Sequence, residues 1–190
     1  MMRIVTTWIV LLLVVAGCTS NPKTGSQKTE MQGDVRAMAQ RTLDRLYNAQ
    51  PKARQVVNGA AGHAVFSNFG LKIFVAGSGS GQGVAVNNRT KTETFMRMAE
   101  IQAGWGMGVK KFSLVWVFDT SEALDRFVNS GWELSAQASG AIKANEDRGL
   151  SMEGAMAVAP GVWVYQLTEA GLALELTAKG TKYYKDDGLN

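Results

Sequence analysis

The stretch Leu71–Thr90, LKIFVAGSGSGQGVAVNNRT, carries a glycine at every second position from Gly77 to Gly83. Alternate residues of a β-strand share one face, so this spacing predicts a strand with one face free of side chains. Such a bare strip permits a close approach of backbone or side chains, or strong curvature. The Asn87–Asn88 pair that follows is a turn signal. We therefore expect a tightly curved antiparallel sheet around this segment.

Alternating residues continue through much of the remaining chain. A strand region starts near Glu93 and ends in QAGWGMGVKKFSLVWVF, residues 102–118, whose three glycines again share one face. Further strand-like runs span residues 63–69, 132–142, 151–159, 161–168 and 171–180. A turn is expected at Pro160–Gly161, and the last two runs form a hairpin. The tail, residues 182–190, is polar apart from two tyrosines.

Three helices are expected. Residues 30–49 repeat apolar side chains at three- and four-residue steps, which predicts an amphipathic helix that packs on the core or lies on a membrane. A second, short helix ends near Gly59, and a third spans residues 121–129, with Ser121 as N-cap and Gly131 after its end. The sequence therefore predicts an α+β fold: a strongly curved antiparallel sheet or barrel-like sandwich with N-terminal helices and one inserted helix.

The first seventeen residues have the pattern of a secretion signal. Arg3 precedes an apolar run of about thirteen residues, which is short for a membrane-spanning helix of roughly twenty. The run ends in VAGC, residues 15–18, which resembles the bacterial lipobox, whose cysteine is acylated and becomes the mature amino terminus. An incidental cysteine after an ordinary signal, or a retained membrane anchor, are the alternatives. We expect lipidation at Cys18, the one cysteine of the chain, and so no disulfide.

The lipobox resemblance also implies a location. Thr19 follows Cys18, and an aspartate at this place favours retention in the inner membrane of Gram-negative bacteria. The resemblance therefore implies a lipid anchor on the periplasmic face of the outer membrane, held stably by two or more acyl chains. After the signal peptide, residues 1–17, we expect a lipidated flexible tether over residues 18–29 and a single domain over residues 30–190.

Composition limits the possible partners. The formal net charge of +4 falls to +3 without Arg3, which weakly suits an anionic lipid surface. The basic residues are scattered, so we expect no nucleic-acid partner. A single histidine and a lipidated cysteine predict no metal site, and no motif indicates a cofactor.

Catalytic motifs are missing from the sequence. His63 is the one histidine and stands in an apolar run, where a packed or edge position is favoured over a catalytic base. Ser78 and Ser80 lack the flanking glycines of a nucleophile elbow. The glycine run lacks the GK[ST] ending of a phosphate-binding loop. We expect no catalytic residues and no enzyme activity.

Four basic residues are candidates for lipid binding. Lys110 and Lys111 follow the second glycine strip, and with Lys72 and Arg89 they predict a basic rim for anionic lipid. The alternative is a set of solvated side chains at a sheet edge, where lysine also limits aggregation.

Seven segments, in order, resemble the SYLF domain, a family of lipid-binding and actin-regulating domains also found as bacterial lipoproteins. They are AGHAVFSNF, the GxGxGxG strand, QAGWGMGVKKFSLVWVF, SEALDRF, WELSAQASGAI, VWVYQLTEAGLALEL and YY, within residues 56–184. The chain departs from the family at His63, at Ser67–Asn68, where a proline is usual, and at Thr92–Phe95, where a tryptophan-proline element is usual. The resemblance implies the fold and a general affinity for anionic lipid.

Three classes of function follow. The first is a non-enzymatic lipoprotein that binds lipid or another envelope component, which predicts an apolar cavity or a basic membrane-facing rim. The second is a structural module that holds a protein partner and binds no small ligand, which predicts a closed core and an exposed apolar patch. The third and weakest, an enzyme acting on lipid or peptidoglycan, requires His63 in a cleft beside a carboxylate and a hydroxyl.

Overall fold

An antiparallel sheet and three helices make up the computed structural model, which describes residues 24–73, 76–103, 108–134, 152–173 and 180–190. The helices are α1 (Gly25–Ala49), α2 (Ala53–Gly59) and α3 (Ser121–Ser130). The strands are β1 (Gly62–Ile73), β2 (Ala76–Asn87), β3 (Glu93–Ala103), β4 (Gly108–Phe118), β5 (Trp132–Leu134), β6 (Met156–Ala159), β7 (Val162–Thr168), β8 (Gly171–Ala173) and β9 (Thr181–Lys185).

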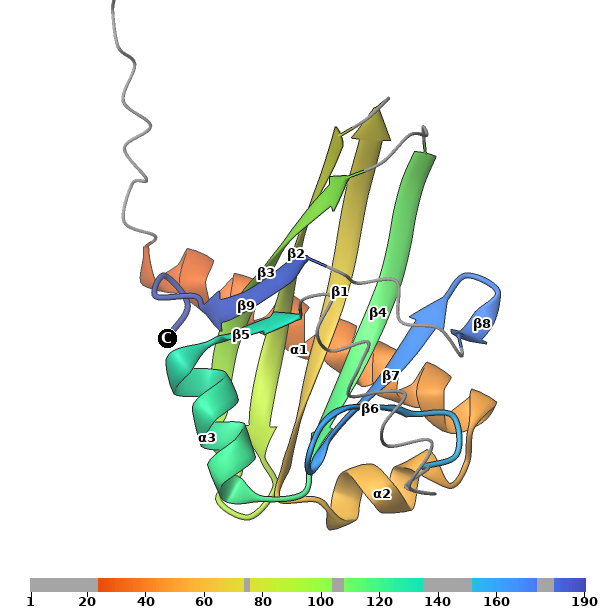
Figure 1. Ribbon diagram of the computed structural model, residues 1–190. Coiled ribbons are helices and arrows are strands. Elements are labelled where there is room, and N and C mark those ends of the chain that lie inside the picture. Colours follow the sequence, from red (N-terminus) through yellow and green to blue (C-terminus); the bar gives the residue numbers. More distant parts are fainter. Residues whose placement is uncertain (1–23, 74–75, 104–107, 135–151, 174–179) are drawn as a thin grey trace, which may run out of the picture.

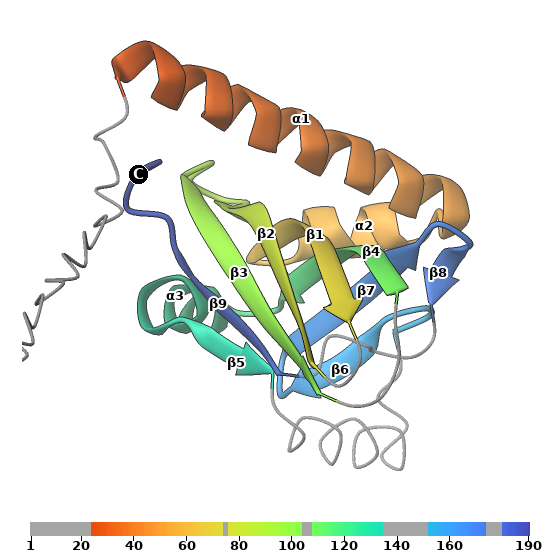
Figure 2. The same ribbon diagram turned by 90° about the horizontal axis from the view of Figure 1, so that it is seen from above.

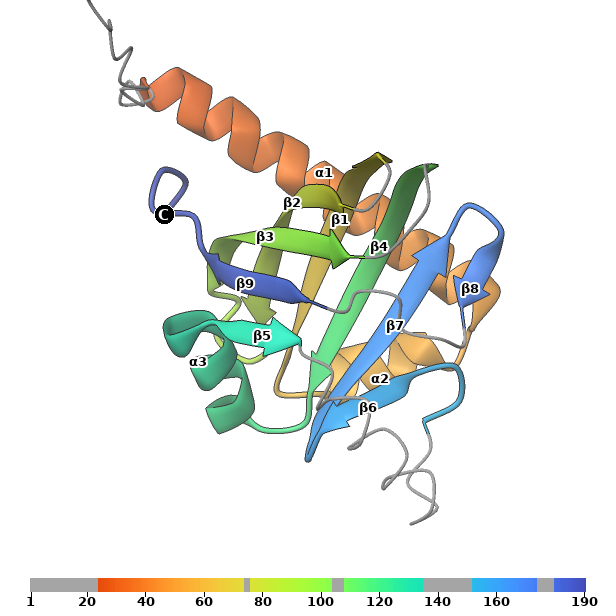
Figure 3. The ribbon, with the colours of Figure 1, turned by 45° about the horizontal axis from the view of Figure 1, so that its top comes forward.

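The sheet is curled, and several of its neighbouring strands are far apart in the chain. The order is β5-β9-β3-β2-β1-β4-β7-β6, with β8 paired to β7 (Figures 1 and 3). The β7–β8 pairing confirms the hairpin expected at the end of the chain. The helix α3 lies beside β5 and β9, whereas α1 and α2 lie on the other side of the sheet (Figure 1). The expected α+β fold, with a curved antiparallel sheet, N-terminal helices and one inserted helix, is confirmed.

The glycine strip lies at the centre of the inner face, as its spacing predicts. Gly83 pairs with Phe66 on β1 and with Met96 on β3, and Gly81 pairs with Met98. A Cβ atom at Gly83 would collide with the Phe66 ring, and one at Gly81 would lie 2.7 Å from Met98 Cγ. The side chains of the two neighbouring strands therefore occupy the space that β2 leaves empty. The second glycine strip lies partly outside the described residues, since β4 begins at its last glycine.

An aromatic cluster fills the inside of the curl. The Tyr183 ring on β9 is fully buried, with its centroid 4.9 Å from that of Phe66 and 4.9 Å from that of Trp116. Phe127 of α3 adds a ring whose centroid is 5.0 Å from that of Trp116. The sequence-based reading of residues 182–190 as a polar tail is therefore wrong. The strand was missed because its buried residues alternate with lysines and an exposed tyrosine over only five positions.

The helix α1 packs across the outside of the curled sheet (Figure 2). Pairing aligns five buried residues into an apolar row across the outer face, which we call the seat row: Phe95, Val84, Val65, Val115 and Tyr165. The helix buries Val35, Ala39, Leu46 and Tyr47 in the same cluster. Val35 and Leu46 each contribute about 1.5–3 kcal/mol when fully buried. Of the two placements open to the amphipathic helix, the structure shows packing on the core.

Two helix boundaries differ from the expectation. The helix α1 begins at Gly25, so the last residues of the expected tether form its first turns. The backbone N–H of Thr24 donates to Gln27 Oε1 at 3.0 Å, which supports this earlier start. The N-cap of α3 is Thr120 rather than Ser121, because the Thr120 hydroxyl accepts from the Ala123 N–H at 3.2 Å. The helix ends as expected, at a glycine with φ of +72°.

Two glycine-to-alanine substitutions test the glycine strip. We expect Gly83→Ala to lower the free energy of unfolding by about 1–3 kcal/mol, because the new methyl group displaces the Phe66 ring. In Gly33→Ala, within α1, the added Cβ meets nothing within 4 Å, so we expect a gain of about 0.5–1 kcal/mol. Urea unfolding followed by tryptophan fluorescence measures both. Shifts of the same sign would contradict the steric role of the strip.

Candidate functional site

Three of the four predicted lipid-binding residues lie together at one end of the sheet. On the β1–β4 pair, Lys72 faces Gly108, Gly70 faces Lys110 and Phe69 faces Lys111. We call this region the lysine end. It lies on the part of β1–β4 that extends past β5 and β9 (Figure 1).

Arg89 does not join these lysines. It lies in the turn between β2 and β3, next to the start of β1 and so at the opposite end of the sheet. Its Nη2 donates to Ser121 Oγ at 3.2 Å, which ties the turn to the first residue of α3. The predicted rim of four basic residues is therefore wrong, because the hairpin carries Arg89 one full strand length away.

A groove lies between α1 and the lysine end on the outer face. On the strands that they share, the residues of its floor lie two positions from the seat row, on the same face and toward the lysine end. Strand pairing aligns them in a single row, which we call the groove row: Tyr184, Arg97, Gln82, Ser67, Ser113 and Leu167. The row crosses β9, β3, β2, β1, β4 and β7, and it replaces the apolar seat with mostly polar side chains.

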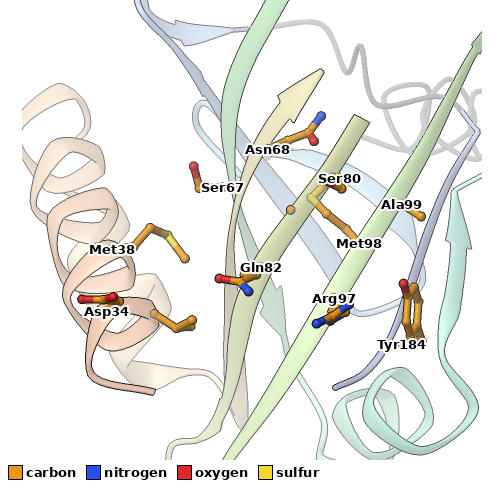
Figure 4. A pocket seen from close by; sticks show the side chains of 12 residues that line it. Asp34, Met38, Ser67, Asn68, Ser80, Gln82, Arg97, Met98, Ala99 and Tyr184 are labelled. Carbon is orange, nitrogen blue, oxygen red and sulfur yellow. The ribbon is translucent and has the colours of Figure 1, made fainter. Parts of the chain in front are cut away.

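Two adjoining hollows make up this groove. The first has a volume of about 520 Å³ and runs from Tyr184 to Ser67, with Asp34 and Met38 of α1 as its wall (Figure 4). The second has about 350 Å³ and continues to Leu167, with Arg45 of α1 beside it. Because Ser67 and Asn68 line both hollows, the groove is continuous along the helix.

The two arginines of the groove are held by neighbouring atoms. Arg97 Nε donates to Asp186 Oδ2 at 2.8 Å, and this hydrogen bond raises the pKa of Arg97. Arg45 Nη2 donates to the carbonyl oxygen of Thr168 at 2.8 Å. The ring of Tyr184, with 39% of its surface exposed, remains open to solvent at one end of the row.

A buried polar pair lies on the inner face, directly behind the groove. Asn68 Nδ2 on β1 donates to Glu100 Oε2 on β3 at 2.5 Å, and both side chains are at most 3% exposed. The two residues are separated by β2, and they meet over Gly79, whose added Cβ would lie 3.0 Å from both side chains. Within the described part of the chain, Asn68 Oδ1 and Glu100 Oε1 have no further partner. The bare strip is what allows this contact.

Burial of the phenol group and the nearby Glu100 raise the pKa of Tyr183 well above its usual value. Neither Asn68 nor Glu100 was singled out as a site residue from the sequence. The contact between Asn68 and Glu100 depends on the pairing registers of β1 with β2 and of β2 with β3. No sequence motif predicts these registers. The glycine spacing was the one signal that predicts contact across β2.

The His63 side chain forms a hydrogen bond that links neighbouring parts of the fold. Asn88 Nδ2 donates to the carbonyl oxygens of Val57 at 2.6 Å and Ala60 at 2.9 Å, which turns Asn88 Oδ1 toward the imidazole. The Nδ1–H of His63 therefore donates to Asn88 Oδ1, at 2.8 Å. Burial lowers the pKa of His63, partly offset by this hydrogen bond, and Lys91 lowers it further. The neutral ring ties β1 to α2 and to the turn after β2.

Two further properties of the described ranges bear on the site. No group of three or more His, Cys, Asp or Glu side chains in those ranges is arranged to hold a metal ion. No helix in them is both long enough and apolar enough to cross a membrane. Cys18 lies outside the described residues.

A double-mutant cycle tests the buried pair. We expect Asn68→Ala to lower the free energy of unfolding by about 1–3 kcal/mol, since the buried Glu100 carboxyl group loses its amide donor. The exposed Ser80→Ala on β2 is the control, with a change within about 0.5 kcal/mol. Urea unfolding of Asn68→Ala, Glu100→Ala and the double variant gives the coupling. Additive effects of the two substitutions would rule out a direct interaction across Gly79.

No family model matches the chain. The chain is 33% identical over 172 residues to Beta cell expansion factor A of Aeromonas veronii. The alignment covers 89% of this chain and 61% of that protein, so the chain spans about three fifths of the relative it matches. The similarity therefore includes most of the described fold.

Proposed function

We propose that the chain is a non-enzymatic lipoprotein, anchored by acylated Cys18 at the periplasmic face of the outer membrane, whose SYLF-like domain binds anionic lipid. The segments that resemble the SYLF family fall on β1, β2, β3–β4, α3, β5, β7–β8 and β9, in chain order. The observation that carries the lipid-binding part is the gathering of Lys72, Lys110 and Lys111 at one end of the sheet.

The lysine end combines positive charge with apolar sequence. Strand register aligns four residues in one row beside Lys72 and Lys110 in the chain: Ile101, Ser78, Leu71 and Val109. Apolar residues beside lysines are the composition of segments that lie in a membrane interface. Each lysine near an anionic surface contributes about 1 kcal/mol.

The anchor and the lysine end support each other. A lipid anchor holds the domain close to the membrane, so a second, weak contact forms at high effective concentration. Three lysines at about 1 kcal/mol each favour the bound state by about a hundredfold. Such a contact orients the domain on the membrane, whereas the anchor alone sets only its distance.

Metabolic labelling tests the anchor. We expect the full chain, expressed in a Gram-negative host, to incorporate labelled palmitate and to float with outer-membrane vesicles in a density gradient. Cys18→Ser removes the thiol that forms the thioether, so label and membrane association are both lost. Label retained in Cys18→Ser would contradict the lipobox assignment. A labelled chain in the inner-membrane fraction would contradict the location alone.

Liposome co-sedimentation tests the domain itself, with the chain from Thr19 onward so that no acyl group contributes. We expect binding to vesicles rich in anionic lipid, weakened by salt, and no binding to neutral vesicles. Lys72→Gln/Lys110→Gln/Lys111→Gln lowers the affinity about a hundredfold, because three charges near the surface are removed. Arg89→Gln, at the other end of the sheet, is the matched control and leaves binding unchanged.

Two results would count against the proposal. Equal binding by the triple variant would move the membrane contact elsewhere. No binding to either vesicle would leave the acyl group as the membrane contact and favour the alternative of a protein-interaction module.

A further inference from the structure

We propose that the groove along α1 binds a linear, uncharged glycan strand in an extended conformation. The proposal concerns the groove row and its α1 wall, and it does not depend on lipid binding. Lys111 is the residue that the groove shares with the lysine end, because it lines the second hollow. It is carried by the alignment of the groove row, the continuity of its two hollows and the chemistry of its side chains.

The shape of the groove suits an extended polymer. The groove row crosses six neighbouring strands, from β9 at one end of the row to β7 at the other. Adjacent strands lie about 4.8 Å apart, so the floor is roughly 24 Å long. The two hollows join at Ser67 and Asn68, and no strand edge interrupts them. A small compact ligand would fill only a part of this length.

The floor offers hydrogen-bonding side chains with one aromatic platform. The Ser67 hydroxyl, the Gln82 amide and the Arg97 guanidinium stand side by side in register, and each can bond sugar hydroxyl groups. At the end of the row, the exposed Tyr184 ring offers a flat apolar face with a polar tip. A sugar ring matches this pattern, since it has a C–H face for the aromatic ring and hydroxyl groups at its rim.

The charges of the groove argue against an anionic polymer. The guanidinium of Arg97 is paired with Asp186 at 2.8 Å, so its positive charge is largely compensated. Asp34 lines the first hollow, and Arg45, Lys111 and Glu169 line the second. The groove therefore carries charges of both signs, and a polyanion would be repelled by Asp34 and Glu169. An uncharged chain of hydroxyl groups encounters no such cost.

The geometry also argues against a peptide strand. Peptides that extend a sheet pair with the free N–H and C=O groups of an edge strand. The groove floor is the face of the sheet, where β1, β2 and β3 have partners on both sides. Recognition must therefore come from side chains, as in a glycan-binding cleft.

The groove is formed before any ligand arrives. Val35 and Leu46 bury α1 against the seat row, which fixes the helix as a rigid wall. Little conformational entropy is then lost when a ligand binds. Figure 4 shows Met38 and Asp34 of α1 across the groove from Ser67 and Gln82.

Calorimetric titration of the full chain in detergent tests the proposal. The probes are the β-1,4-linked tetrasaccharide of N-acetylglucosamine, its disaccharide, and a hyaluronan tetrasaccharide as the anionic counterpart. We expect the uncharged tetrasaccharide to bind, the disaccharide to bind at least tenfold more weakly because it spans less of the floor, and the anionic probe to bind more weakly still.

Variants locate the binding site. Tyr184→Ala lowers the affinity for the tetrasaccharide at least tenfold, whereas Tyr184→Phe retains it because the ring remains. Gln82→Ala, at an exposed position in the middle of the floor, weakens binding severalfold. Lys182→Ala is the matched control: it is exposed, lies two residues before Tyr184 on the same strand, and lines neither hollow.

Three results would overturn the proposal. They are no heat of binding with the tetrasaccharide at millimolar concentration, unchanged affinity in both Tyr184→Ala and Gln82→Ala, or stronger binding of the anionic probe. Because Lys111 of the lysine end lines the second hollow, the separate readouts come from the probes: anionic vesicles report on the lipid proposal, and the uncharged tetrasaccharide reports on this one.

Discussion

The absence of side chains along the inner face of β2 is the constraint on which the rest of the structure depends. Neighbouring strands lie about 4.8 Å apart, so residues on β1 and β3 cannot normally touch across the strand between them. Here Asn68 and Glu100 form a hydrogen bond over Gly79, and Phe66 occupies the space beside Gly83. The inner face is thereby shortened relative to the outer face, which is the physical condition for a curled sheet.

Because the sheet is curled, its inner and outer faces pack differently. The inner face closes around aromatic rings, with Tyr183 of β9 packed between Phe66 and Trp116. The outer face is convex, so its side chains do not close around one another. The helix α1 buries one row of them, the seat row. The next band is the groove row, which stays polar because the helix is too narrow to cover it. Side chains alternate between the two faces along each strand. The inner face therefore forms the core, and the outer face forms the seat row and the groove row.

Much of this fold could be predicted from the sequence. The glycine spacing predicted the bare strip and the curved sheet, and the alternation predicted most strands, because period-two burial leaves a visible pattern. The strand β9 was missed since its sequence TKYYK buries only Thr181 and Tyr183 between exposed residues. The groove could not be predicted, because it joins residues far apart in the chain through strand registers. The same reason explains Arg89, which charge alone grouped with lysines at the other end of the sheet.

The bands of the outer face also set a distance between the two proposed activities. Along β1, Val65 belongs to the seat row, Ser67 to the groove row and Lys72 to the lysine end. Lys72 is five residues after Ser67, and at about 3.3 Å per residue this is roughly 17 Å. Lys111 pairs with Phe69 and lines the second hollow, so it lies between Lys72 and the groove row. If Lys72 rests on an anionic surface, the groove row is held about 17 Å above that surface. An extended strand running alongside the membrane could then occupy the groove above the lipid contact, with Lys111 at the boundary between the two sites.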